Sequence, residues 1–156
     1  MWKKQKCTLT SKDITILQTM YDRRHSLADS VHELLKHKLD NAIVVFSEDI
    51  DAKTVTLNTR VRYRIGDGQP QTAIITQGRM DGMVGQCLSL GTVRGLALLG
   101  LTETDELSLP RQGNTAPDRL VVEAVLFQPE AARRERLKQE LTARTLRLVH
   151  DASLME

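Results

Sequence analysis

Hydrophobic residues recur at helical spacing over residues 11–42, and one polar stretch, residues 22–26, interrupts them. The first apolar stripe consists of Ile14, Leu17 and Tyr21, and the second of Leu27, Val31, Leu34, Leu35, Leu39 and Ala42. Ser11 and Ser26 are the predicted N-caps, because a serine hydroxyl can accept a hydrogen bond from the first turn of a helix. The pattern predicts two adjacent helices that form a short antiparallel hairpin.

The hydrophobic period changes after Ile43, where short runs of β-forming residues alternate with polar turns. The expected strands cover residues 55–57, 61–65, 72–76, 87–90, 107–109 and 120–127. We also expect turns at 66–68 and 112–114, a glycine-rich loop at 78–86 and a short buried helix at 97–101. Helices followed by a run of strands predict an α+β fold with an antiparallel sheet.

Residues 130–149 return to helical spacing at the end of the chain. Leu137, Leu141 and Leu148 mark an apolar side of this expected helix, and Glu140 precedes Arg144 by four residues, a favourable order for an exposed ion pair. Two interpretations remain open. The helix packs on its own domain, or it mediates self-association or binds a partner.

Size and composition favour a compact domain with an appendage. The chain has 156 residues, of which 40% are hydrophobic and 27% are charged. A net charge of +2 and five aromatic side chains argue against direct sequence-specific DNA binding and against a single-strand binding platform. We find no apolar run long enough for a signal peptide or a membrane span. We therefore expect a cytoplasmic protein in which Cys7 and Cys87 are reduced thiols.

Two groups of residues suggest chemistry at first sight. Gly95 and Gly100 have the spacing of a phosphate-binding loop, but the lysine that would reach the phosphates is missing. His25, His32 and His37 do not share one helix face, so they are poor candidates for a metal site. We expect no cofactor, no metal and no enzymatic activity.

Three segments, in order along the chain, resemble a known domain. Residues 55–61, residues 94–101 with the Thr104–Glu106 bend, and residues 126–132 are similar to segments of the C-terminal domain shared by GreA/GreB transcript-cleavage factors and Rnk proteins. Each motif alone is weak, whereas the ordered set is fairly specific and extends over about residues 11–132. The chain most resembles the Rnk group, the regulators of nucleoside diphosphate kinase.

The resemblance implies three parts. A short coiled-coil hairpin would occupy residues 8–46, an FKBP-like domain residues 52–129 and a C-terminal helical extension residues 130–156. It also implies a bacterial protein that docks on RNA polymerase near the secondary channel. By resemblance, the docking residues would be Gly91, Thr92, Val93, Arg94, Gly95 and Leu96, and the hairpin tip would be Asp22, Arg23 and Arg24. Many relatives carry proline in place of Val93, and Gre factors carry an acidic residue in place of Gly91.

The length of the hairpin distinguishes between the activities of this superfamily. The expected second helix, residues 27–42, is only about 24 Å long at 1.5 Å per residue. Gre factors use a longer hairpin with an acidic tip, whereas here Asp22 lies next to two arginines. We therefore expect a non-catalytic regulator that competes with Gre-type or DksA-type factors and does not stimulate transcript cleavage.

Two further functions remain as alternatives. The implied FKBP-like fold is shared with peptidyl-prolyl isomerases and chaperone-like modules, for which Tyr63, Phe46 and Phe127 would have to line an apolar pocket. The family name also leaves open a direct contact with nucleoside diphosphate kinase.

Overall fold

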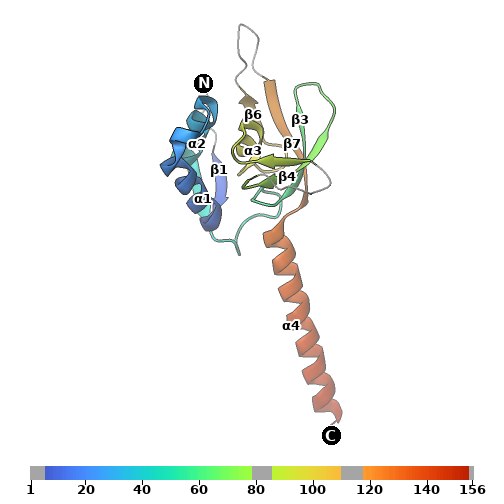
Figure 1. Ribbon diagram of the computed structural model, residues 1–156. Coiled ribbons are helices and arrows are strands. Elements are labelled where there is room, and N and C mark those ends of the chain that lie inside the picture. The colour runs from blue at the N-terminus through green and yellow to red at the C-terminus, as the bar shows by residue number, and fades with distance from the viewer. Residues whose placement is uncertain (1–5, 79–85, 110–117, 155–156) are drawn as a thin grey trace.

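The computed structural model describes residues 6–78, 86–109 and 118–154, and it has the α+β fold that the sequence predicts (Figure 1). A five-stranded sheet with the order β5-β4-β3-β7-β6 forms the body of the molecule. Its strands are β3 (Arg60–Ile65), β4 (Gln71–Thr76), β5 (Cys87–Ser89), β6 (Glu106–Leu109) and β7 (Asp118–Phe127). The expected turn at 112–114 and most of the expected loop at 78–86 lie outside the described residues.

The pairing of the sheet is antiparallel except at one edge. β3 is antiparallel to β4 and to β7, and β6 is antiparallel to β7. β5 instead runs parallel to β4. Buried residues alternate with exposed arginines along β3, so Val61 and Tyr63 face the core.

The two predicted helices are confirmed. Two unpredicted strands flank them, one before the first helix and one after the second. The chain runs through β1 (Cys7–Thr10), α1 (Ser11–Asp22), the 3-10 turn η1 (Arg24–Ser26), α2 (Asp29–Asn41) and β2 (Ala42–Val45). β1 and β2 pair in parallel, with Cys7 opposite Ala42 and Thr10 opposite Val45. The two strands therefore join the beginning and the end of the helical pair, which is defined here as α1, η1 and α2.

The predicted caps of both helices were wrong. Thr10 is the N-cap of α1, and its hydroxyl accepts a hydrogen bond from the backbone N–H of Asp13 at 3.0 Å. The reason is β1, which keeps the backbone extended up to Thr10, so that Ser11 is already helical. Ala28 precedes α2 without a side-chain cap, and Ser26 donates its hydroxyl proton to the carbonyl of Arg23 instead.

The short buried helix begins earlier than predicted. α3 spans Val93–Leu98, and its N-cap is Thr92, whose hydroxyl accepts a hydrogen bond from the N–H of Gly95. Gly100 ends this region with φ +86°, a conformation that L side chains rarely adopt. The expected strand at 55–57 does not form. This segment is buried, and the N–H of Val55 donates to the carbonyl of Leu101 at 2.8 Å.

One hydrophobic cluster joins the helical pair to the sheet. It contains Leu17 from α1, Leu34 and Leu35 from α2, Leu96 from α3 and Tyr63 from β3. In Figure 1, the helical pair accordingly lies alongside the sheet. The division of the chain at 8–46, 52–129 and 130–156 stays a prediction.

α4 (Pro129–Leu154) is attached to the body at its N-terminal end and extends away from it (Figure 1). Near that end, Arg134 donates a hydrogen bond from its guanidinium to the carbonyl of Ser47 at 3.1 Å. Among the described residues, no helix has both the length and the apolar character needed to cross a membrane.

Candidate functional site

A groove of about 240 Å³ lies between the helical pair and the ends of β4 and β5. It is lined by Ile16, Thr19, Met20, Arg23, Ser26, Leu27, Gln77 and Gly91. Arg23 belongs to the predicted hairpin tip, and Gly91 belongs to the predicted docking residues. The fold thus brings together one member of each set, although the two sets are far apart in the sequence.

The loop that carries Gly91 is held by hydrogen bonds to one residue of β5. The carbonyl of Ser89 accepts hydrogen bonds from the N–H of Thr92 at 3.0 Å and from its hydroxyl at 2.7 Å. The Ser89 hydroxyl accepts a further one from the N–H of Gly91 at 3.0 Å. These bonds fix the path of the backbone from β5 into α3.

The end of this loop requires a glycine. A Cβ at Gly95 would lie 2.2 Å from the carbonyl oxygen of Ser89, a distance that no side chain tolerates. Gly95 therefore allows α3 to pack directly against the end of β5. This steric role accounts for one of the two glycines whose spacing suggested a phosphate-binding loop, and the positive φ of Gly100 accounts for the other.

The six predicted docking residues differ in accessibility. Gly91, Thr92 and Arg94 are exposed and Val93 is half-buried. Gly95 and Leu96 are buried, and Leu96 belongs to the core cluster. A partner can therefore touch residues 91–94, whereas Gly95 and Leu96 support that surface from below.

Arg94 connects this surface to the central strand of the sheet. Its positive charge acts on the side chain of Tyr63, whose hydroxyl donates to the side-chain carbonyl of Gln71 at 3.1 Å. Burial raises the pKa of Tyr63, and the positive charge of Arg94 partly opposes this increase. Tyr63 is only 1% exposed, so its ring is not available to line a proline-binding pocket of the kind that an isomerase needs.

The three residues of the hairpin tip have different surroundings. Arg24 lies over the ring of Tyr21, with 4.7 Å between the guanidinium carbon and the ring centroid, and donates a hydrogen bond to the Tyr21 carbonyl. The same ring stacks on His32 at 5.6 Å between centroids. Asp22 and Arg23 are exposed. The accessible charges of the tip are thus one carboxylate and one guanidinium.

A buried lysine joins the helical pair to the C-terminal end of α3. The ammonium group of Lys38, on α2, donates hydrogen bonds to the carbonyls of Ala97 and Leu99. Complete burial lowers the pKa of Lys38 to about 8, because desolvation penalises the charged form. Nothing in the sequence pattern indicates this burial, since a lysine in an amphipathic helix is normally solvated.

Four residues of the groove were also missed. Ile16, Thr19 and Met20 lie on α1, and Gln77 follows β4. The spacing of Ile16 and Met20 is compatible with a helix surface, but nothing local in the sequence indicates that this surface faces Gly91. The sequence offered no signal for a contact made only by tertiary packing.

Neither a family model nor a curated protein matches the chain. Solved structures do match. A prokaryotic transcription elongation factor GreA/GreB from Nitrosomonas europaea is similar with a TM-score of 0.55 and 26% identity, and the match covers 80% of this chain and 100% of that one. The structural neighbours are transcription elongation factors of the GreA/GreB type.

Two other neighbours are more distant. GreA factor homologue 1 of Thermus thermophilus matches with a TM-score of 0.35 and 15% identity over 79% of this chain and 100% of that one. The corresponding protein of Thermus aquaticus gives 0.39 and 14% over 77% and 97%. Both TM-scores are lower than that of the Nitrosomonas europaea factor, and both identities are lower as well.

Proposed function

We propose that the chain is a non-catalytic transcription regulator that binds RNA polymerase near the secondary channel. The observation that carries this proposal is the groove in which Arg23 of the tip and Gly91 of the loop before α3 face a common space. The full-length coverage of a GreA/GreB elongation factor supports the partner class. The contact surface would be Gly91–Arg94 together with Arg23.

The helical pair supports occupancy of the channel rim without stimulation of transcript cleavage. α1 has 12 residues and α2 has 13, which correspond to only about 18 and 20 Å of helix. Both helices contribute to the core of the domain, so little of their length is free to project into a channel. Asp22 is the one carboxylate of the tip, and Arg23 follows it directly. A protein of this shape would compete with Gre-type or DksA-type factors for the rim.

The Rnk assignment belongs to the same proposal. The ordered motifs at 55–61, 94–101 and 126–132 support it. In this proposal, the link to nucleoside diphosphate kinase is a change in the level of that enzyme that results from transcription regulation. The protein would act in the cytoplasm, where it would meet RNA polymerase.

A binding assay with purified core RNA polymerase tests the proposal. Fluorescence anisotropy of the labelled full chain should report saturable binding, and an unlabelled Gre factor should displace it. Arg94→Glu and Arg23→Glu should each weaken binding at least tenfold, because each places a negative charge on the proposed contact surface. Lys53→Glu is the matched control, since Lys53 is exposed and lies outside the groove.

Two results would overturn the proposal. One is the absence of saturable binding by the wild-type chain. The other is equal weakening by Arg94→Glu and Lys53→Glu, which would indicate a nonspecific effect of charge. A transcript-cleavage assay on stalled elongation complexes tests the second part, and shortening of the transcript on addition of this protein would refute it.

A further inference from the structure

α4 has an apolar side that the other described residues of the chain leave uncovered. All side chains from Glu135 to His150 are exposed. Leu137, Leu141 and Leu148 are 48%, 63% and 70% exposed. A helix without tertiary packing is marginally stable in water, because most helix stability in proteins comes from burial of an amphipathic face. The length of α4 and its exposed leucines together indicate that another molecule packs against this side of the helix.

The three leucines form a narrow stripe. At 100° per residue, Leu137, Leu141 and Leu148 lie within about 40° of one another around the helix axis. Their spacings of four and seven residues are those of a coiled-coil seam. Glu140 and Arg147 lie on one edge of the stripe, about 80 to 100° from its centre, where flanking charges contact a partner helix. We name Leu137, Leu141 and Leu148 the leucine stripe.

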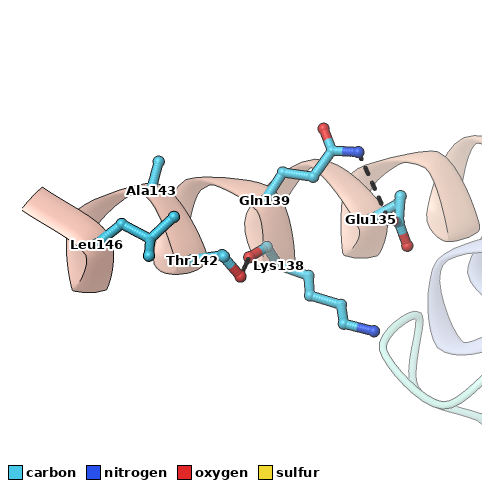
Figure 2. Close-up of a pocket in the computed structure, with 6 residues that line it drawn as sticks. All are labelled: Glu135, Lys138, Gln139, Thr142, Ala143 and Leu146. Carbon is cyan, nitrogen blue, oxygen red and sulfur yellow. Dashed lines mark hydrogen bonds between the residues drawn. The ribbon is translucent and has the colours of Figure 1, made fainter.

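The opposite side of α4 carries four polar residues together with Ala143 and Leu146. A groove of about 360 Å³ lies there, and all of its described lining residues belong to α4. Figure 2 shows these six side chains along the helix. The Thr142 hydroxyl donates to the carbonyl of Lys138, and Gln139 donates to Glu135, so polar groups on this side are bonded along the helix itself. Leu146 also lies in this groove, about 160° from the centre of the leucine stripe. Leu146 is thus separated from the leucine stripe by polar residues.

We propose that the leucine stripe pairs two copies of this chain through antiparallel α4 helices. In the matching register, Leu137 of one copy lies opposite Leu148 of the other, twice by symmetry. Leu141 lies opposite the aliphatic part of Arg144. Glu140 then faces Arg147 of the second copy, again twice, so the charges on the edge of the seam are complementary.

A parallel pair would place like charges together. Arg144 and Arg134 would each meet the same residue of the second copy along the seam, and Glu140 would have no positive residue opposite it.

The antiparallel pair also suits the shape of the molecule. Because α4 extends away from the body (Figure 1), the two bodies would lie at opposite ends of the paired helices without contact. The groove at Arg23 and Gly91 would remain accessible in both copies.

Sedimentation velocity of the full chain over a wide concentration range tests this pairing. The wild-type protein should change from monomer to dimer as its concentration increases. Leu148→Asp should remain monomeric, because it places a carboxylate opposite Leu137 of the second copy. Leu146→Asp is the matched control and should dimerise like the wild type, since Leu146 is exposed but lies on the other side of α4.

Charge exchange tests the register. Glu140→Arg and Arg147→Glu should each raise the dimer dissociation constant about tenfold, because two attractive pairs become repulsive. The double exchange should restore wild-type affinity, since the antiparallel pairs are re-formed with reversed sign. Circular dichroism of each variant checks that α4 stays helical.

Three results would overturn the proposal. They are a monomeric wild type at every concentration, an equal loss of dimer in Leu148→Asp and Leu146→Asp, and a double exchange that fails to restore affinity. These outcomes do not depend on the binding of RNA polymerase, so the two proposals can fail separately.

Discussion

Arg23 and Gly91 line the same groove, although Arg23 directly follows α1 and Gly91 lies in the loop before α3. Tertiary packing thus unites two surfaces that family resemblance had named separately. A partner that contacts the loop at Gly91 also meets the tip at Arg23. Because the tip of the helical pair lies next to the body, it can contact only a partner surface that is close to the loop at Gly91.

We predict that Gly95→Ala destabilises the fold by about 1–3 kcal/mol, the usual cost of overpacking a dense interior. The added Cβ would lie 2.2 Å from a backbone oxygen of β5, so α3 would have to move. Urea denaturation monitored by circular dichroism measures the loss. Gly78→Ala is the control, because a Cβ at Gly78 meets nothing within 4 Å. Equal stabilities of the two variants would contradict the proposed steric role of Gly95.

The N-cap of α1 gives a second prediction. Thr10→Ala should lower the free energy of unfolding by about 1 kcal/mol, because the N–H of Asp13 loses its acceptor. Ser11→Ala should change stability much less, since Ser11 is exposed and already inside the helix. If the serine variant proved the less stable of the two in thermal unfolding, Ser11 would be the cap.

Lys38 should make stability depend on pH in the alkaline range. The pKa of Lys38 is about 8 in the folded chain, compared with its ordinary value of 10.5. Between these values the unfolded chain binds the additional proton, so stability should increase as the pH rises from 8 to 10.5. Below pH 8, the fold carries the full cost of the buried ammonium group.

The variant Lys38→Met isolates this effect, because methionine cannot titrate. The difference in unfolding free energy between wild type and variant, measured in urea at several pH values, should shift in favour of the wild type as the pH rises through this range. A difference that stays constant from pH 7 to 10.5 would show that the lysine has its ordinary pKa of 10.5.

The two thiols should differ in reactivity. Cys7 is 3% exposed, and burial raises the pKa of its thiol, so little of the reactive thiolate forms at neutral pH. Cys87 is more accessible. We expect iodoacetamide to modify Cys87 first in the native protein, as followed by mass spectrometry of the digested chain. Modification of Cys7 at the same rate would mean that β1 opens readily.

The helical pair and most of the sheet could be predicted because periodicity reports burial directly. Leu17, Leu34 and Leu35 are fully buried, as their spacing indicated. β1 and β2 were missed because each is a four-residue strand adjoining a helix, and the apolar run from Ala42 to Val45 does not alternate. Such short strands form through their pairing with each other, which no local pattern records.

The site was predicted less completely than the fold. Resemblance named Arg23 and Gly91, but not that they share a groove with Ile16 and Met20. The parallel pairing of β5 on β4 and the exposed side of α4 are also products of tertiary arrangement. Sequence patterns report which side of an element is apolar, whereas they do not report what faces that side.

The pairing of β1 with β2 has a consequence for complex formation. The β1–β2 pairing connects the two ends of the helical pair. The N–H of Thr8 also donates to the carbonyl of Gly100 at 3.0 Å, which connects these ends to the body. The helical pair is therefore held at both of its ends and not at one. Ordering of a swinging arm costs conformational entropy when a complex forms. A protein built in this way loses little of that entropy on binding, because its recognition surface is already in place before the encounter.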